Sequence, residues 1–329
     1  MPQTVIEAVN LRKWFPVKLG FFQSILSRKE LYVKAVDGID IDIQKQEIFG
    51  LAGESGSGKT TIGKLLLRLI EPTSGKIIFQ GKDITKASDE ELKALRRKMQ
   101  IVFQDPYESL NPKMTVFDVL AEPLRVQRLA SGSELEERVY KALENVELFP
   151  PEEFVWRFPH ELSGGQRQRV ATGRALVVNP EFIVADEPVS MLDVSIRAEI
   201  LNLMFNLMEK HGVTFIYITH DLALARHICN RIAILYLGKI AEKGLTEKVI
   251  FEPLHPYTRA LIAAVPDPDP EARRIETVIK GEIPSPINPP SGCRFHTRCP
   301  SYIGDICRQK EPELKEKEKG RFVACHLYD

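Results

Sequence analysis

The chain begins with two stretches in which apolar and polar residues alternate. Residues 5–9 and residues 39–43 both place an apolar side chain at every second position. A period of two is typical of strands with one buried and one exposed face, as in antiparallel sheets. A small antiparallel sheet is therefore expected at the start of the fold.

The next segments follow the order strand, glycine-rich loop, helix. Residues 47–52 are a short apolar strand, and residues 62–70 have the bulk and spacing of a buried helix. Residues 88–91 then read Ser-Asp-Glu-Glu, the layout of a capping box, and predict a helix through Lys98. Residues 99–103 predict another strand.

The middle of the chain alternates helices with buried strands. Residues 116–178 are mostly helical in pattern, and the apolar runs 182–185 and 213–219 are separated by the helical stretch 194–210. Such alternation predicts a parallel α/β sheet. Residues 232–237 and 240–242, joined by Gly238-Lys239, predict a closing hairpin.

A change of composition marks the last part of the chain, because 11 of the 22 prolines follow residue 251. Dense prolines favour extended, loop-rich structure that needs an additional cross-link to be ordered. We therefore expect a main domain over residues 1–250, with a helical subdomain at about 105–175, and a C-terminal extension over residues 251–329.

Composition limits the function classes. With 329 residues, 43% hydrophobic and 27% charged, the composition is typical of a globular protein. Its 45 basic and 45 acidic residues balance, so the chain has no net positive charge to attract nucleic acid. It has no apolar run of the roughly 18 residues that span a membrane, and residues 1–4 lack a secretory layout. We expect a cytosolic chain that does not bind nucleic acid.

The glycine-rich loop fits the pattern G-x-x-x-x-G-K-[ST] of phosphate-binding loops. Its glycines let successive backbone N–H groups curl around phosphate oxygens, and the following helix turns the positive end of its dipole toward the anion. Lys59 is expected to hold the β and γ phosphates and Thr60 to bind Mg²⁺. The predicted nucleotide-binding residues here are Gly53, Ser55, Gly56, Ser57, Gly58, Lys59, Thr60 and Thr61.

Two adjacent carboxylates end the apolar strand that starts at Phe182. In α/β sheets, ligands bind beyond the carboxyl ends of the strands, where Asp186 and Glu187 are expected. Asp186 suits the Mg²⁺ shell, which leaves Glu187 to position and polarise the attacking water.

Residues 162–166 read Leu-Ser-Gly-Gly-Gln, the signature sequence of the ATP-binding cassette (ABC) family, and the chain resembles that family. A serine hydroxyl, small residues and a helix N-terminus make a second phosphate site. The resemblance implies a P-loop NTPase fold and a head-to-tail dimer. In that dimer Ser163, Gly164, Gly165 and Gln166 complete the nucleotide site of the partner.

The same resemblance assigns further residues in the expected order. Gln104 matches the glutamine loop that touches Mg²⁺ and the attacking water, Asp193 matches the loop that crosses the dimer, and His220 matches the switch histidine at the γ phosphate. Phe15 falls where the family stacks an aromatic ring on adenine. The alternative is that Phe15 or Trp14 is an ordinary core residue.

Finer resemblance points to the oligopeptide/dipeptide importer ATPases, more like the second of their two paired ATPases. Only 57 residues separate Gln104 from Leu162, which excludes a coiled-coil arm, and the chain has one cassette. The resemblance is carried by residues 33–38, 104–112, 255–258 and 291–296. Met191 and Arg197 depart from the family pattern, and Met191 is expected to affect packing across the dimer.

The resemblance implies ATP hydrolysis that powers peptide import. The partners it implies are a second ATP-binding subunit, identical or paralogous, two membrane permease subunits and, indirectly, an external substrate-binding protein, with the chain at the cytoplasmic face of the membrane. Nickel or oligosaccharide import, or a regulatory subunit with little hydrolysis, remains the alternative. Residues 19–22, Leu-Gly-Phe-Phe, are either a membrane- or permease-facing loop or a buried turn.

Four of the five cysteines lie in the last 37 residues, and Cys229 stands alone. Cys293, Cys299, Cys307 and Cys325 have 5, 7 and 17 residues between them, which is not the spacing of a zinc knuckle. Four thiolates can hold zinc, with His296 and His326 as further ligands, or an iron-sulfur cluster. Reduced cysteines without metal are the third possibility. The family resemblance implies a [4Fe-4S] cluster at these four positions.

Overall fold

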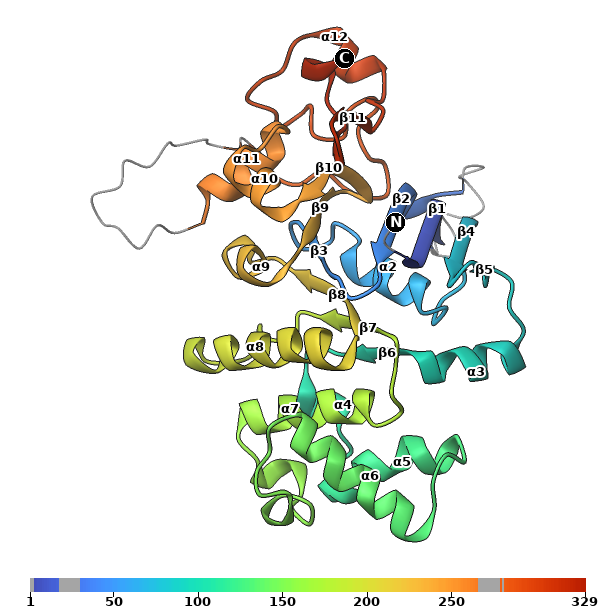
Figure 1. The fold of residues 1–329 in the computed structure, drawn as a ribbon. Helices are drawn as coiled ribbons and strands as arrows, with labels where there is room; N and C mark the ends of the chain where they lie inside the picture. Colours follow the sequence, from blue (N-terminus) through green and yellow to red (C-terminus); the bar gives the residue numbers. More distant parts are fainter. Residues whose placement is uncertain (1–2, 18–29, 266–278, 280) are drawn as a thin grey trace, which may run out of the picture. The chain divides into compact units, whose positions relative to one another are not determined.

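A computed structural model describes residues 3–17, 30–265, 279 and 281–329 (Figure 1). The chain forms two compact units, each built from separate stretches of sequence. The first unit comprises Met1–Val5, Gln44–Ile48 and Lys86–Ile218, and the second comprises Ile6–Ile43, Phe49–Thr85 and Thr219–Asp329. Residues 19–22 lie outside the described residues. Within the described ranges, no helix is long and apolar enough to cross a membrane.

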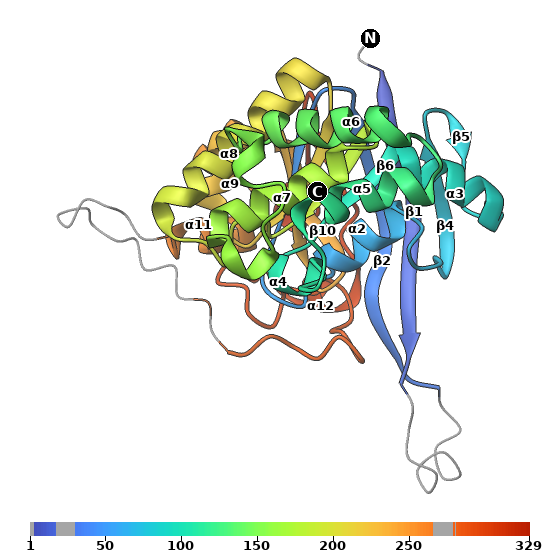
Figure 2. The same cartoon turned by 90° about the horizontal axis from the view of Figure 1, so that it is seen from below.

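The second unit contains the predicted antiparallel sheet. Its strand order is β2-β1-β4-β5, and β1 pairs with β4 in antiparallel register, with Ile6 opposite Phe79. The long strands β1 and β2 run side by side (Figure 2). In β2, alternate residues from Ile39 to Ile43 are buried, as the sequence pattern predicted. In β1 the adjacent Val5 and Ile6 are both buried and Val9 is exposed, so the alternation there is incomplete. The bounds are β1 Thr4–Pro16, β2 Tyr32–Gln44, β4 Ser74–Phe79 and β5 Lys82–Asp83.

The second unit also contains a mixed set of strands in the order β11-β12-β10-β9-β3. The fully buried β3 lies parallel to β9, and β9 forms an antiparallel hairpin with β10. The remaining strands, β10, β12 and β11, pair antiparallel in turn. The bounds are β3 Ile48–Ala52, β9 Arg231–Tyr236, β10 Lys239–Leu245, β11 Lys315–Glu318 and β12 Arg321–Val323.

The predicted turn of this hairpin was wrong by one residue. Tyr236 pairs with Lys239, so the two turn residues are Leu237 and Gly238, not Gly238 and Lys239. Both have positive φ, 44° and 77°, as a two-residue type I′ turn requires. The turn could not be recognised from the sequence, because its first position holds a leucine where Asn, Asp or Gly is usual.

The helices of the second unit are short. The predicted helix at 62–70 is α2, which begins at Lys59 directly after the glycine-rich loop and ends at Leu66. It ends early because Arg68 adopts φ 52° and its guanidinium donates to the carbonyl of Ile84. The helices are α2 Lys59–Leu66, α9 Leu222–Ile228, α10 Thr246–Phe251, α11 Pro256–Ala263, α12 Asp305–Gln309 and the 3-10 turn His326–Tyr328.

The first unit is built on three parallel strands in the order β8-β7-β6. Asp186, at the end of β7, lies opposite Ile218 near the end of β8. The capping box at Ser88 is present, with Glu91 N–H donating to the Ser88 hydroxyl at 3.3 Å, and it starts α3 as predicted. The bounds are α3 Asp89–Lys98, β6 Met99–Val102, β7 Phe182–Asp186, α8 Val194–His211 and β8 Thr214–Thr219.

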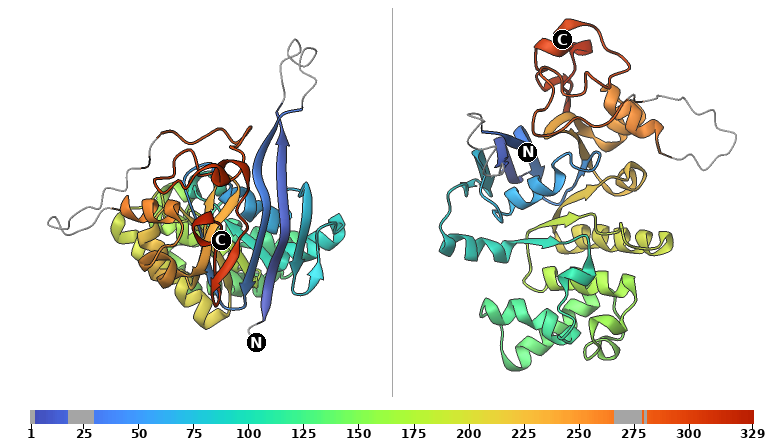
Figure 3. Two further views of the ribbon diagram at one scale, coloured as in Figure 1. Left: turned by 90° about the horizontal axis from the view of Figure 1, so that it is seen from above. Right: turned by 180° about the vertical axis from the view of Figure 1, so that it is seen from behind.

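Helices α4 to α7 gather on one side of these strands within the first unit (Figures 1 and 3). The helices α5, α6 and α7 pack against one another, and α4 packs on α7. Their bounds are α4 Pro106–Ser109, α5 Val116–Val126, α6 Gly132–Asn145 and α7 Gly164–Leu176, with 3-10 turns at Pro151–Glu153 and Pro159–Glu161. The α/β fold class is confirmed. The domain limits at residues 105, 175 and 250 stay predictions.

Candidate active site

The phosphate loop (residues 53–61) leaves the carboxyl end of β3 in a conformation that requires glycine. Gly53 has φ 149° and Gly58 has φ 105°. A Cβ atom would lie 2.3 Å from the Leu235 carbonyl oxygen at Gly53, and 2.2 Å from the Ala35 carbonyl oxygen at Gly58. Gly56 also has a positive φ of 76°, but open space surrounds it. Two of the three glycines are therefore fixed by both backbone angle and close packing.

Lys59 folds back over the phosphate loop. Its Nζ donates to the carbonyl oxygens of Gly53 at 2.8 Å and Glu54 at 3.0 Å, and the side chain is buried. Gly58 is the N-cap of α2 and supplies no side-chain cap, so the first N–H groups of the helix are not used by a capping side chain. Ser55, Gly56 and Thr60 are exposed, whereas Ser57 is buried and Thr61 half-buried. The loop thus combines a helix N-terminus with one enclosed ammonium group.

Asp186 and Glu187 lie at the carboxyl end of β7, as predicted. Asp186 is buried, and Glu187 has φ 46°, a left-handed conformation that is uncommon for a residue with a side chain. The Glu187 N–H donates to Ile218 at 3.0 Å, and its carbonyl accepts the Ser190 hydroxyl at 3.0 Å. These bonds hold the strained backbone, and strain of this kind is common at functional sites.

Gln104 follows β6, the strand next to β7, and reaches the same edge. Its Nε2 donates to Oε2 of Glu187 at 3.4 Å. The two residues are 83 positions apart in the chain, and they meet because β6 and β7 are adjacent parallel strands whose carboxyl ends meet. The structure therefore brings together two residues that the sequence placed in one site: the glutamine and the expected base.

The signature residues open α7. The Ser163 hydroxyl accepts the Gln166 N–H at 3.3 Å, and Oε1 of Gln166 accepts the Ser163 N–H at 3.0 Å, a reciprocal capping box. A Cβ on Gly165 would lie 2.6 Å from Cγ2 of Ile196, so this glycine lets α7 approach α8 closely. Gln166 therefore has a capping role that the sequence analysis did not foresee.

Asp193 is the N-cap of α8 and is exposed. Nε of Arg197 donates to the Leu192 carbonyl at 2.9 Å, which ties the loop before α8 to its first turn. Met191 is 62% exposed and does not pack into the interior of the unit. Of the two departures from the family pattern, Arg197 thus stiffens this loop and Met191 changes its surface.

His220 and Phe15 belong to the second unit. His220 is exposed directly after β8, and the next residue, Asp221, caps α9 through the Leu224 N–H at 3.1 Å. Phe15, at the end of β1, is 38% exposed, and Nζ of Lys13 lies 5.0 Å from its ring centroid. Nε1 of Trp14 donates to Asp37 at 3.1 Å. Trp14 is therefore engaged with Asp37, and stacking of adenine on Phe15 stays a prediction.

The four C-terminal cysteines lie near one another. Burial is the main cause that raises the pKa of Cys293 to about 12, and the charges of Cys325, Cys299 and Cys307 act in the same direction. Burial likewise raises the pKa of Cys325 to about 11 and that of Cys299 above its usual value. Among the described residues, which include all four, no three Cys, His, Asp or Glu side chains are placed to hold one metal ion.

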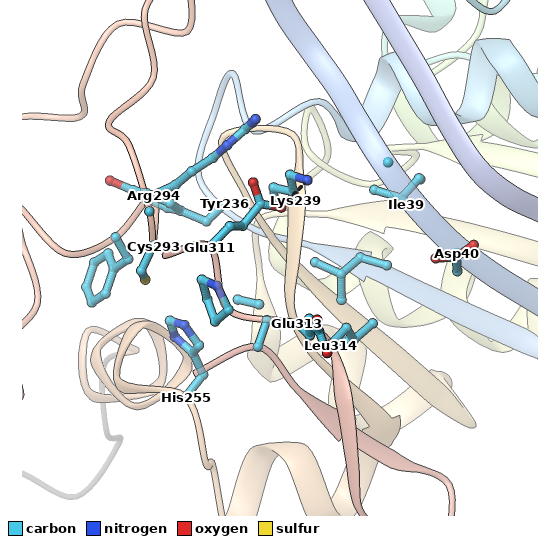
Figure 4. A pocket seen from close by; sticks show the side chains of 17 residues that line it. Ile39, Asp40, Tyr236, Lys239, His255, Cys293, Arg294, Glu311, Glu313 and Leu314 are labelled. Carbon is cyan, nitrogen blue, oxygen red and sulfur yellow. Dashed lines mark hydrogen bonds and ion pairs between the residues drawn. The ribbon is translucent and has the colours of Figure 1, made fainter. Parts of the chain in front are cut away.

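A cavity of about 350 Å³ lies beside the cysteine segment (residues 293–299). Cys293 and Arg294 lie on one side of it and Ile39 and Asp40 on the other (Figure 4). Lys239, also in its wall, forms an ion pair with Glu311 at 2.5 Å. These lining cations already have protein partners, because Arg294 in turn pairs with Asp37.

Two residues of the second unit that contact the phosphate loop, Arg298 and Tyr257, were not predicted from the sequence. The Glu54 carboxylate forms an ion pair with Arg298, and the Glu54 N–H donates to the Tyr257 hydroxyl at 3.0 Å. Their only signal in the sequence is position: Arg298 stands next to Cys299, and Tyr257 lies in one of the stretches that carry the family resemblance.

Comparison with protein families gives two matches. The ABC transporter family model matches residues 36–190, and the model of the oligopeptide/dipeptide transporter C-terminal region matches residues 241–307. The oligopeptide transport ATP-binding protein AppF of Bacillus subtilis is 47% identical, covering 99% of this chain and 98% of that protein. A putative peptide import ATP-binding protein of Brucella ovis is 51% identical, covering 89% of this chain and 92% of that protein.

Solved structures agree with these matches. The dimeric ATP-binding cassette MJ0796 in a post-hydrolysis state with ADP and Pi has a TM-score of 0.63 and 32% identity, covering 73% of this chain and 98% of that one. The protein cbiO1 from Clostridium perfringens, part of the ABC transporter complex cbiONQ, has a TM-score of 0.65 and 26% identity, covering 76% of this chain and 92% of that one. The chain therefore belongs to the ABC transporter family and is one of its ATP-hydrolysing subunits.

Proposed function

We propose that this chain hydrolyses ATP to power the import of peptides through a membrane transporter. The observation that carries the proposal is the contact of Gln104 with Glu187 beside the buried Asp186, at the carboxyl edge of the parallel strands. The names of AppF and of the Brucella ovis relative support peptides as the substrate class.

In this proposal, the phosphate loop binds ATP through its backbone N–H groups and Lys59. Thr60, Asp186 and the Gln104 side chain offer the hard oxygen ligands that Mg²⁺ prefers, and Mg²⁺ supplies charge neutralisation at the β and γ phosphates. Glu187 accepts a proton from the attacking water, while the amide of Gln104 orients the Glu187 carboxylate. His220 and Phe15 contact the γ phosphate and the adenine, respectively.

The partner we infer is a second ATP-binding subunit in a head-to-tail dimer. Ser163, Gly164, Gly165 and Gln166 begin a helix whose N-terminus suits an anion, and Asp193 and Met191 are exposed on the adjacent loop. A single chain thus has two phosphate-binding helix N-termini, which a dimer would combine at each nucleotide. Two permease subunits at the cytoplasmic face of the membrane and an external binding protein complete the proposed complex.

The test of import uses the complex assembled from this chain, its permeases and its binding protein in proteoliposomes. We expect ATP-dependent accumulation of labelled di- and oligopeptides, because hydrolysis is coupled to transport in the proposed complex. Accumulation of nickel or an oligosaccharide without peptide would assign the chain to a related importer. Absence of ATP turnover in a complex that binds ATP would instead favour the regulatory alternative.

We also propose that Cys293, Cys299, Cys307 and Cys325 hold a [4Fe-4S] cluster. The four thiols lie near one another within the last 37 residues of the chain. Burial raises the pKa of Cys293 and Cys325, so their thiolates are unfavourable unless a positive metal centre compensates them. The spacing of 5, 7 and 17 residues between the four cysteines is not that of a zinc knuckle, whereas an iron-sulfur cluster accepts irregular spacing. We therefore favour iron and sulfide over zinc, and the cluster would cross-link the proline-rich extension.

Anaerobic purification is expected to yield a brown chain with about four iron and four sulfide per chain. Cys307→Ala should lose the iron, because it removes one of the four ligands. Cys229→Ala, which removes a buried thiol outside the group, should keep it. Stoichiometric zinc without iron, or equal iron in both variants, would contradict the cluster.

A further inference from the structure

The cysteine segment reaches the phosphate loop through two arginines. The segment reads Cys-Arg-Phe-His-Thr-Arg-Cys, so Arg294 and Arg298 stand just inside its two terminal cysteines. Nη1 and Nη2 of Arg298 donate to the two carboxylate oxygens of Glu54 at 2.9 and 3.2 Å, a two-bond ion pair. Glu54 is the second residue of the phosphate loop, and the partners are 244 positions apart in the chain.

This ion pair is shielded from solvent. The Arg298 side chain is 9% exposed and that of Glu54 is 23% exposed. Nη1 of Arg298 also donates to the Tyr236 hydroxyl at 3.3 Å. Removing one partner of such a pair leaves a charge without compensation in a buried place, which is much more costly than losing an exposed pair.

Glu54 also links the ion pair to the phosphate-binding groups. Its carbonyl accepts from Nζ of Lys59 at 3.0 Å and from the Ser57 N–H at 3.2 Å, and its N–H donates to the Tyr257 hydroxyl. Burial raises the pKa of Tyr257 well above its usual value, so this hydroxyl is neutral. The C-terminal extension therefore holds the side chain and the N–H of Glu54, while Lys59 holds its carbonyl.

The second arginine supports the same loop less directly. Arg294 donates to Asp37 and to the carbonyl of Leu237, and the neighbouring Gly238 N–H donates to the Ser57 carbonyl at 2.8 Å. Between the two arginines, Phe295 is fully buried against the rings of Tyr236 and Tyr257, with centroids 5.2 Å apart in both cases. Phe295 therefore anchors the stretch between the two arginines in the interior of the unit.

We infer that Arg298 is a positioning residue for nucleotide binding: through its ion pair with Glu54, the cysteine segment fixes the phosphate loop in its binding conformation. Arg298 acts on the nucleotide only through Glu54. Its loss allows the loop and Lys59 to adopt other arrangements, so part of the binding free energy must restore the productive one.

The test is a double-mutant cycle on the full chain, with the dissociation constant of MgATP measured by a fluorescent ATP analogue. R298Q and E54Q are each expected to weaken binding about fivefold, and the double variant to weaken it no further, because both remove the same ion pair. R298K, which keeps the charge without the two-bond geometry, should restore part of the affinity. KM for ATP should rise with the dissociation constant, while kcat falls by less.

The matched control is R259Q. Arg259 also lies in the C-terminal extension and donates to the Pro253 carbonyl and the Tyr328 hydroxyl, at 2.9 and 3.1 Å. R259Q should bind MgATP as the parent does. The inference is overturned if R298Q leaves the dissociation constant unchanged, if its effect persists in full on the E54Q background, or if R259Q weakens binding as much.

Discussion

Replacing Glu187 by glutamine is expected to lower steady-state ATP hydrolysis about 10²- to 10⁴-fold while ATP binding is retained. Glutamine has nearly the same size, so it can occupy the same place at the end of β7 and keep the Gln104 contact through its oxygen. It cannot accept a proton from water, so ATP stays bound and uncleaved. In the proposed head-to-tail dimer, the closed state should then accumulate.

Phosphate release by the assembled complex and ATP-dependent dimerisation of the isolated chain measure the two parts of this prediction. Glu181→Gln is the matched control, because Glu181 precedes the same strand at its other end and pairs with Lys98 at 2.9 Å. The control should hydrolyse ATP at the parental rate. Undiminished turnover in Glu187→Gln would exclude Glu187 as the base, whatever the effect on dimerisation.

Much of the fold could be predicted because its signals are local. The alternation in β2, the capping box at Ser88 and the apolar β7 each depend on a few consecutive residues. The family resemblance placed Gln104 and Glu187 in one site without a physical reason. The structure gives the reason for their contact, because the adjacent parallel strands β6 and β7 end at one edge.

The contacts that support the phosphate loop could not be predicted, because they join residues far apart in the chain. Nothing in the sequence distinguishes Arg298 and Glu54 from other arginines and glutamates, and the two side chains meet only in the folded chain. The stretch at residues 255–258 carried a family resemblance without a physical reason. The structure gives one: His255 caps α11 through the Tyr257 N–H, and the Tyr257 hydroxyl accepts the Glu54 N–H.

The pKa of His255 agrees with its capping role. Burial lowers this pKa to about 4, so the ring is neutral and its Nδ1 can accept the Tyr257 N–H at 3.0 Å. A sequence shows a histidine before a proline, but it does not show that the ring is enclosed. Enclosure is what decides the charge, and hence whether the ring can serve as an acceptor.

Gly58→Ala is expected to lower the free energy of unfolding by about 3 kcal/mol and to weaken ATP binding at least about tenfold. The added Cβ would meet the Ala35 carbonyl oxygen at 2.2 Å, and φ at this position is 105°. The oxygen belongs to the backbone of β2, so it cannot move aside as a side-chain end can. The loop must shift, and the N-terminus of α2 shifts with it.

Gly56→Ala is the control that distinguishes the effect of the clash from the effect of the backbone angle. Gly56 also has positive φ, but a Cβ atom there would meet open space. The free energy of unfolding should fall by only about 1 kcal/mol, which is the cost of placing an alanine in the left-handed conformation. Thermal unfolding and MgATP binding, measured on both variants, check the difference. If the two alanines cost the same, backbone angle alone explains the glycines. If Gly58→Ala costs more, close packing against the Ala35 carbonyl also sets the shape of the phosphate loop.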